Sequence, residues 1–246
     1  GTTCSLNDTD IRGLTAASGK TINSTPGTTI DFDDFYGATS IVHIVASGGS
    51  TTTSGNYKFH YFTSSGTFTV STAGSGGSAY TTVDYIVIAG GGAGGGRAGG
   101  GGGAGGYKTG TFTAAAQSYS VTIGGGGSPT PDQPTNGSNS SLAGVHTSTG
   151  GGVGGDQIAT RYAAGNGGSG GGAGYQYDTS PGTGVSGEGN SGGTAKHVPW
   201  NYPAGGGGGK GGAGGNGIQQ AGGNNYSSGT TGAGGSGSST GDANYN

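Results

Sequence analysis

Glycine content is the feature that most limits what this chain can fold into. Of its 246 residues, 68 are Gly, against roughly 7% in an average protein. Glycine is a poor helix former, because its backbone loses the most entropy when it is ordered. The chain also has no Met, one Glu and three Leu, so a helical bundle or an α/β enzyme fold is excluded. Collagen is excluded as well, because the glycines run in blocks such as residues 99–103.

The apolar residues and the glycines divide the chain into two halves. All six Phe precede residue 113, and 16 Ile, Leu and Val lie in residues 1–124 against seven in 125–246. In contrast, 56 of the 68 glycines lie in residues 85–246. Only the first half can therefore build a conventional core. We predict three parts: a leader over 1–37, a β-unit over 38–123 with a glycine-rich excursion at 90–106, and a glycine-rich region over 124–246.

Short β-patterned segments fill residues 38–123. They are rich in β-branched and aromatic residues and are separated by Gly and Ser turns. We expect strands at residues 40–46, 56–63, 67–71, 81–89, 109–113 and 118–123. The most apolar of them, 81–89, is expected to be a central strand. Strands at such short spacing favour a small antiparallel β-sandwich, so the predicted fold class is all-β with almost no helix.

The glycine runs after residue 89 have two interpretations. One is a flexible linker. The other is an ordered bundle of threefold extended glycine helices, which have no internal hydrogen bonds and must pair with neighbouring segments. Aromatic and polar clusters interrupt the runs, for example at residues 175–177 and 197–202, and a simple spacer does not need them. We favour a partly polyglycine-II-like region in which these clusters are loops at the ends of runs.

The sequence contains no convincing catalytic or metal-binding pattern. Gly90-x-Gly92-x-x-Gly95 imitates a dinucleotide fingerprint, but the following residues cannot form the helix that holds a pyrophosphate. Residues 205–210 imitate a phosphate-binding loop, but Gly211 stands where Ser or Thr binds Mg²⁺. Cys4 has no second cysteine, and the four His lack partners at metal-ligand spacing. We predict no enzyme activity, no cofactor and no metal.

Charge and hydropathy narrow the range of partners. The net charge is −3, which provides no electrostatic footprint for nucleic acid. No run of about 18 apolar residues is present, so membrane insertion is not expected. The N-terminus also lacks the basic-then-apolar pattern of a secretory signal.

Aromatic residues in a background of Gly, Ser and Asn have the composition of antibody binding loops. Trp, Tyr and Arg dominate binding hot spots. The predicted receptor-contact residues are therefore Arg161, Tyr162, Tyr175, Tyr177, Trp200 and Tyr202. The alternative is that these side chains clamp the glycine bundle by packing on it, and the sequence leaves both readings open.

Three ordered blocks carry a family resemblance. They are YKFHYFTSSGTFTV (residues 57–70), VDYIVIAGGG (83–92) and YSVTIGGG (119–126). This pattern resembles the glycine-rich domain that is common in bacteriophage virion proteins. The leader phrases SLNDTDIR (5–12) and IDFDDFYG (30–37) are similar to phrases near the glycine-rich parts of phage tail proteins.

The resemblance implies a virion protein of a tail fibre or its tip that mediates recognition of the host surface without enzymatic activity. It further implies contact with other virion proteins through residues 1–37, a host receptor that is a protein or a glycan, and a homotrimer, the usual fibre symmetry. Two alternatives stay open. One is a purely structural fibre or decoration protein on head, neck or tail, and the other is a secreted glycine-rich filament protein.

Overall fold

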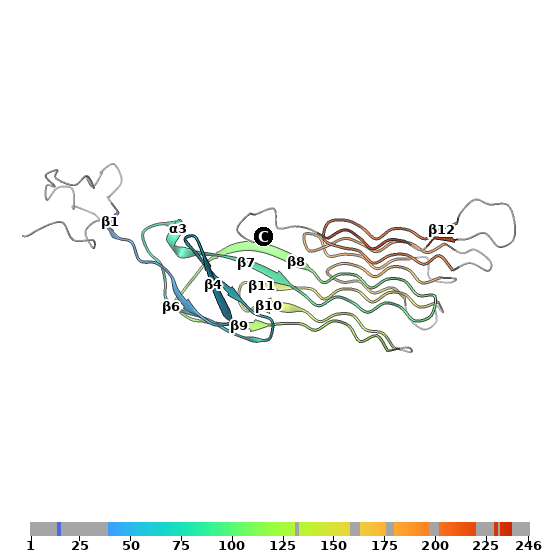
Figure 1. The fold of residues 1–246 in the computed structure, drawn as a ribbon, viewed down its shortest axis with the longest axis horizontal. Coiled ribbons are helices and arrows are strands. Elements are labelled where there is room, and N and C mark those ends of the chain that lie inside the picture. Colours follow the sequence, from blue (N-terminus) through green and yellow to red (C-terminus); the bar gives the residue numbers. More distant parts are fainter. Residues whose placement is uncertain are drawn as a thin grey trace, which may run out of the picture. The chain divides into compact units, whose positions relative to one another are not determined.

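The structure is a computed structural model of the 246-residue chain. It describes residues 14–15, 39–130, 133–157, 163–175, 180–196, 202–219, 229–230 and 232–237. These residues form short strands and long extended segments, with one helix of four residues, α3 (Ser78–Thr81) (Figure 1). The all-β fold class with almost no helix is thereby confirmed. Most of the predicted leader, residues 1–37, lies outside the described residues.

The first of two compact units has a small conventional core. It contains the described parts of residues 1–48 together with residues 68–84 and 111–118. Strand β3 (Val45–Ser47) pairs antiparallel with β6 (Gly66–Thr72). Phe68 and Val70 lie two residues apart on β6 and therefore share one face, where both are buried. The Ala114 N–H donates to the Thr81 carbonyl at 2.9 Å, directly after helix α3.

The second unit begins with a hairpin. This unit contains residues 49–67, 85–110 and the described part of 119–246. Strand β4 (Ser50–Ser54) pairs antiparallel with β5 (Tyr57–Tyr61) over their full lengths. Gly55 in the two-residue turn has a φ of 56°, a conformation that glycine adopts readily and that tight hairpin turns require.

The remaining strands form one larger sheet and several two-stranded sheets. The larger sheet has the order β11–β10–β9–β6–β3, where β9 is Ser118–Thr122, β10 is Ser140–Leu142 and β11 is His146–Ser148. Apart from the β4–β5 hairpin, the two-stranded sheets are β7 (Thr82–Ile88) with β8 (Tyr107–Thr113), β1 (Leu14–Thr15) with β2 (Thr39–Ser40), and β12 (Ile218–Gln219) with β13 (Gly229–Thr230).

The strand predictions agree with the structure except at two places. The predicted strand 40–46 is not continuous. It is divided between the end of β2 and the start of β3, and between them Val42 forms only an isolated bridge with Ser75. Strand β7, expected at the centre of a sheet, pairs with β8 in a two-stranded sheet. The Ser148 hydroxyl donates to the Val87 carbonyl at 2.9 Å, so a side chain occupies an acceptor that a further strand would need. The sequence analysis missed β4, which has only Ser and Thr and therefore shows no apolar alternation.

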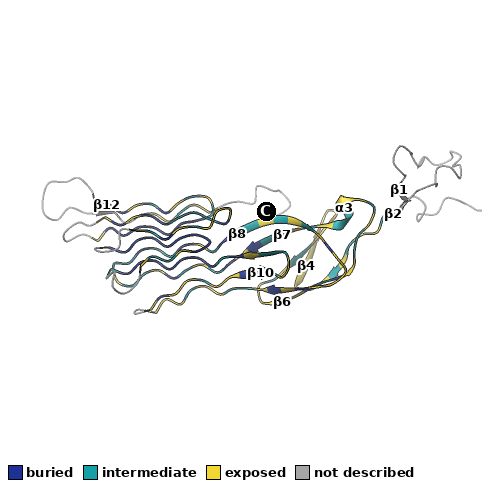
Figure 2. Ribbon diagram, turned by 180° about the vertical axis from the view of Figure 1, so that it is seen from behind, coloured by how far each residue is buried: buried dark blue, intermediate teal, exposed yellow. Residues whose placement is uncertain are grey.

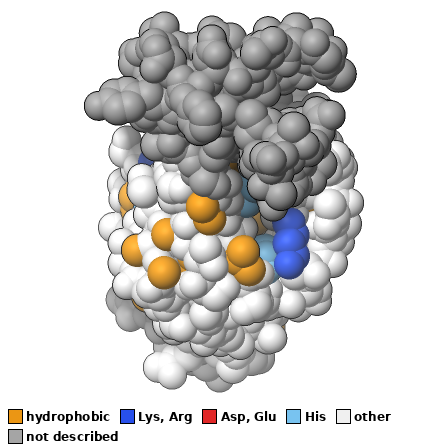
Figure 3. Space-filling view, turned by 90° about the vertical axis from the view of Figure 1, so that its left-hand side faces the viewer, with side chains coloured by type: hydrophobic (Ala, Val, Ile, Leu, Met, Phe, Trp, Pro, Cys, Tyr) orange, Lys and Arg blue, Asp and Glu red, His pale blue; other side chains and the backbone are white. Residues whose placement is uncertain are grey.

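Several large apolar side chains are exposed on β3 and β5. Tyr57 and Tyr61 on β5 and Val45 on β3 are each more than half exposed. Figure 3 shows one face of the molecule, where the visible apolar side chains are dispersed among polar atoms.

Most of the second unit is a set of glycine-rich segments that lie side by side and hydrogen-bond through their backbones (Figure 1). We call this set the glycine array, which comprises residues 89–106, 123–130, 133–139, 149–156, 163–175, 181–196, 202–217 and 232–237. Its apolar core is built from small side chains, since Ala173 is fully buried and Val153 and Ala204 are nearly so. Figure 2 shows the burial concentrated in the inner segments.

The hydrogen bonds of the glycine array recur every third residue. Within 99–106, every third N–H donates to the segment 149–155 at 2.7 to 2.8 Å, namely those of Gly100, Gly103 and Gly106. The donors that follow them reach the segment 205–208 at 3.0 Å, namely Gly101 and Ala104. A β-strand alternates with period two, whereas a threefold extended helix repeats with period three and bonds only to its neighbours. The ordered, polyglycine-II-like reading is therefore confirmed for these segments, and a flexible linker is excluded there.

Close approach of the segments explains why this region is so rich in glycine. A Cβ atom on Gly103 would lie 2.1 Å from the Ser169 carbonyl oxygen, and one on Gly92 would lie 2.2 Å from that of Gly152. Real Cβ atoms essentially never come under 3.0 Å, so no other residue fits there without moving the neighbouring backbone. In contrast, a Cβ on Gly125 meets nothing within 4 Å.

Candidate functional site

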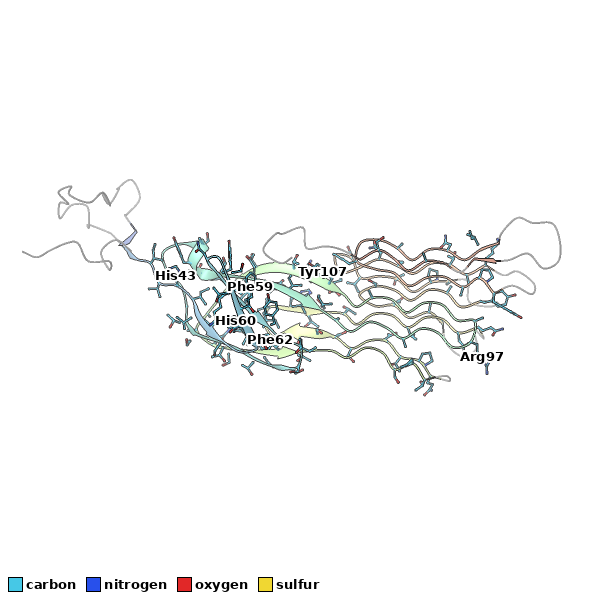
Figure 4. All side chains as sticks on the ribbon, in the orientation of Figure 1. His43, Phe59, His60, Phe62, Arg97 and Tyr107 are labelled. Atoms are coloured by element: carbon cyan, nitrogen blue, oxygen red, sulfur yellow. The ribbon has the colours of Figure 1, made fainter. Side chains whose placement is uncertain are left out.

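Several segments of the glycine array end at the same place. The turn at residues 96–98 is closed by a hydrogen bond from the Gly95 N–H to the Gly100 carbonyl, at 2.9 Å. The Tyr175 N–H donates to the Ala98 carbonyl at 3.2 Å, which brings the end of the segment 163–175 to this turn. Figure 4 shows the labelled Arg97 at this end of the array, at the far end of its segment from Tyr107. We call residues 96–98, 156–157, 175, 196 and 202–203 the loop end.

The hydrogen-bond register assigns the other residues to the loop end. Gly100 donates to Gly155, next to Asp156, and Lys196 donates to Pro203 at 3.1 Å. The chain intervals 158–162, 176–179 and 197–201 are each bounded on at least one side by a residue of the loop end, and they lie outside the described residues. All six predicted receptor-contact residues belong to the loop end or to these intervals.

Two of the six predicted residues form the centre of the loop end. The rings of Tyr175 and Tyr202 meet edge to face, with centroids 4.6 Å apart and an interplanar angle of 90°. This is a favoured geometry for aromatic pairs. Tyr175 is 3% exposed whereas Tyr202 is 48% exposed, so the first ring supports the second, and the second offers about half of its surface to solvent.

Burial also determines the chemistry of the Tyr175 phenol. Removal from water raises its pKa above the ordinary value of 10.0, and the nearby phenol of Tyr202 raises it further. Both causes act on the charged form, because burial and a like charge each disfavour a phenolate. Tyr175 is therefore a neutral packing residue at ordinary pH, and Tyr202 is the described ring of the loop end that reaches solvent.

The other four predicted residues, Arg161, Tyr162, Tyr177 and Trp200, lie outside the described residues. Their assignment as receptor contacts stays a prediction. For Tyr175 the packing is that of a clamp, since almost none of its ring reaches solvent. The packing thus fits the clamp interpretation for Tyr175, and a receptor contact stays a prediction for the other five residues.

Arg97 is a residue of the loop end that the sequence analysis missed. It is exposed, and its φ of 57° makes it the one non-glycine residue with positive φ in the described part of the chain. The signal that would have found it is a lone basic residue inside a glycine run, between Gly96 and Gly99. Sequence reasoning passed over it because no aromatic residue accompanies it.

Asp156 is the acidic residue of the loop end. Its side chain is 1% exposed, and neither carboxylate oxygen has a hydrogen-bond partner among the described residues. No group of three or more His, Cys, Asp or Glu in the described ranges is arranged to hold a metal ion.

The single Glu lies away from the loop end, where the array meets β11. Glu188 is 6% exposed and accepts a hydrogen bond from the Thr149 N–H at 2.7 Å. Its other oxygen lies 3.5 Å from His146 Nε2, and the His146 ring stacks on Tyr85 with centroids 6.1 Å apart. Among the described residues, no second carboxylate belongs to this cluster, which therefore lacks the pair that glycoside hydrolysis uses. We read the cluster as packing that anchors β11 and the turn before Glu188.

The two segments whose sequences resemble nucleotide-binding motifs are both extended segments of the array. Residues 90–95 donate to neighbouring segments, as in the bond from Gly92 to Gly103 at 2.9 Å, and no helix follows them. Residues 205–210 do the same, as in the bond from Gly206 to Gly215 at 2.9 Å. Neither forms the loop-to-helix turn that cradles a phosphate.

These features define an all-β protein in which a small strand-built part is joined to a packed array of threefold glycine segments. The chain belongs to the glycine-rich domain family, whose family model matches residues 63–246. No curated protein and no solved structure matches the chain significantly. Within the described residues, no helix has the length and apolar character to cross a membrane.

Proposed function

We propose that this protein is a non-enzymatic component of a bacteriophage virion, in a tail fibre or at its tip, that recognises the host surface through the loop end. The observation that carries the proposal is the pair Tyr175 and Tyr202, held at the end of a hydrogen-bonded array where several chain segments meet. The resemblance of the strand blocks and leader phrases to phage tail proteins supports the virion assignment. In this proposal residues 1–37 attach the protein to other virion proteins.

The glycine array suits a recognition role for a physical reason. Its segments are bonded to their neighbours every third residue, so the loop end stands on a stiff support. Loops that are held in place before binding lose less entropy when a ligand orders them. A half-exposed ring on such a support, as Tyr202 is, offers contact area at a low entropic cost.

The main alternative is a structural fibre or decoration protein without receptor specificity. It predicts that the aromatic residues of the loop end contribute to folding or assembly and not to adsorption. The burial of Tyr175 fits this alternative, whereas the exposure of Tyr202 favours recognition. A secreted filament protein is a further alternative, and the location of the protein in purified virions separates it from the other two.

A substitution at the exposed ring tests the proposal. Virions with Tyr202→Ala should adsorb to host cells about ten- to thirtyfold more weakly, since a good aromatic anchor contributes about 2 kcal/mol. Trp200→Ala, at a position outside the described residues, should weaken adsorption in the same way. Tyr57→Ala is the matched control, because Tyr57 is 54% exposed on β5 and is not part of the loop end.

Adsorption and thermal unfolding are measured for the same variants. Recognition requires that Tyr202→Ala lowers adsorption while the melting temperature and virion incorporation stay near wild type. Loss of melting temperature or incorporation with normal adsorption per particle would support the structural alternative. Normal adsorption for both variants would refute the recognition proposal.

A further inference from the structure

The backbone of Arg97 is unusual for this chain. A left-handed conformation is costly for an L-residue with a Cβ, and glycine occupies the other seven positive-φ positions of the described residues, namely Gly48, Gly49, Gly55, Gly76, Gly77, Gly144 and Gly187. Gly96 lies directly before Arg97, and Gly99 lies two residues after it. Glycine would therefore fit position 97 with less strain, and the reason for arginine must lie in its side chain. Non-glycine residues in strained conformations gather at ligand-binding sites.

The position of Arg97 connects it to the exposed tyrosine. Arg97 precedes Ala98, whose carbonyl accepts the hydrogen bond from Tyr175, and the ring of Tyr175 supports that of Tyr202. Figure 4 shows the Arg97 side chain extending away from the glycine array. The residue is exposed, and among the described residues no carboxylate forms an ion pair with it.

The surroundings favour a small anionic ligand group over a protein surface. Of the charged residues of the loop end that the structure describes, Arg97 and Lys196 are exposed, whereas the acidic Asp156 is 1% exposed. The fully buried core of a protein interface is more apolar than the rest of the surface, whereas the described part of this end provides one half-exposed ring, that of Tyr202. A guanidinium is always charged and presents donors in a planar fork that matches a phosphate or a carboxylate.

We propose that Arg97 is a specificity-determining contact that binds the phosphate or carboxylate group of an anionic surface saccharide, beside the ring of Tyr202. This inference rests on the proposed recognition function and adds the chemical class of the receptor. The guanidinium supplies paired hydrogen bonds to the anionic group, and the ring of Tyr202 supplies an apolar surface for the sugar. The strained backbone of Arg97 is retained because it aims the side chain outward.

Arginine side-chain spectra provide a direct test, because the chain has only three arginines, Arg12, Arg97 and Arg161. In the full chain, the Nε–H signal missing from Arg97→Gly identifies Arg97. We expect that signal to shift on titration with glucose 6-phosphate or with glucuronate and to stay in place with glucose. The phosphate and carboxylate arms distinguish the two anionic sources. An equal response to glucose, or a response to inorganic phosphate as strong as that to either sugar, would overturn the proposal.

Affinity and stability separate a binding role from a structural one. Arg97→Gly should weaken binding of the responding sugar about tenfold or more, as expected for the loss of a charge-assisted pair. Arg97→Lys keeps the charge but lacks the planar fork of donors, so its affinity should lie between those of wild type and Arg97→Gly. The melting temperature of Arg97→Gly should equal or exceed that of wild type, because glycine adopts this φ freely. A marked fall in melting temperature would overturn the proposal in favour of a structural role.

Adsorption by virions distinguishes failure of this inference from failure of the proposed function. If Arg97→Gly and Tyr202→Ala both lower adsorption, both proposals are supported. If Tyr202→Ala lowers adsorption and Arg97→Gly does not, the anionic contact is overturned while recognition by the loop end stands. If neither lowers adsorption, recognition itself fails, and with it the assignment of a receptor class.

Discussion

At the residue scale, two kinds of glycine occur in the array. Gly103 faces the Ser169 carbonyl oxygen, which a Cβ would approach to 2.1 Å, whereas Gly125 has open space on the same side of its backbone. Neither residue has a positive φ, so conformation does not distinguish them. The difference between the two lies in the neighbouring segment alone.

This difference predicts opposite effects of the same substitution. Gly103→Ala should destabilise the protein by about 1–3 kcal/mol or more, because the neighbouring backbone must move. Gly125→Ala should be neutral or stabilise by up to about 1 kcal/mol, because alanine restricts the unfolded chain. Chemical denaturation of both variants measures the two free energies of unfolding. Equal effects would contradict the close packing of segments that the structure shows.

The raised pKa of Tyr175 predicts a dependence of stability on alkaline pH. The folded state keeps the phenol protonated above its ordinary pKa of 10.0, while the unfolded state releases the proton. This group's contribution is therefore fully present below about pH 10 and is lost as the pH rises through the folded pKa.

Two substitutions isolate that contribution. The denaturation midpoint of wild type should fall more steeply above pH 10 than that of Tyr175→Phe, which keeps the ring and removes the titrating hydroxyl. Tyr202→Phe should weaken the dependence only in part, because burial is the larger cause of the shift. Parallel curves for wild type and Tyr175→Phe would show that Tyr175 is solvated.

At the element scale, the period of the hydrogen bonds distinguishes a threefold glycine segment from a β-strand. In residues 89–95, five backbone N–H groups donate to neighbouring segments, namely those of Ala89, Gly90, Gly92, Ala93 and Gly95. Gly91 and Gly94 have no backbone acceptor among the described residues. Along this segment, two N–H groups that donate to neighbouring segments are thus followed by one that does not.

Hydrogen exchange should reveal this pattern directly. We expect slow exchange for the five paired N–H groups and fast exchange for Gly91 and Gly94, since protection follows hydrogen bonding and burial. Amide exchange followed by NMR resolves the individual residues. Alternation with period two would indicate an edge β-strand, and uniformly fast exchange would indicate a linker, and either outcome would contradict the array.

At the scale of the whole molecule, the small apolar content favours assembly with other copies. We predict a homotrimer, so light scattering should give the mass of three chains of 23.0 kDa each. Deletion of residues 1–37 should abolish incorporation into virions, because we assign attachment to this leader. A stable monomer together with normal incorporation of the shortened chain would refute this view of the assembly.

Much of the fold could be predicted because local sequence carried the signal. Strands β5, β6, β8 and β9 lie close to the predicted ranges, since alternating aromatic and β-branched residues bounded by Gly and Ser are a local pattern. Strand β4 has no such pattern, and β10 and β11 have three residues each. Only pairing with a neighbour defines these strands.

The candidate site divides in the same way. Tyr175 and Tyr202 could be proposed as ligand contacts from composition, but their exposed fractions of 3% and 48% could not be foreseen. Arg97 was missed because its φ of 57° is a property of the folded turn. The residues around it are Gly and Ala, so the sequence does not show at which position of the run the chain turns.

By itself, the sequence determined the all-β class, the exclusion of helix and the division between a conventional core and a glycine-rich region. These depend on propensities and side-chain volumes, which add up residue by residue. Only the tertiary structure decided which glycines face a neighbour and which residues meet at the loop end. A polyglycine segment has almost the same local energy in any register, so bonds between distant residues, such as that from Gly103 to Gly152, settle its position.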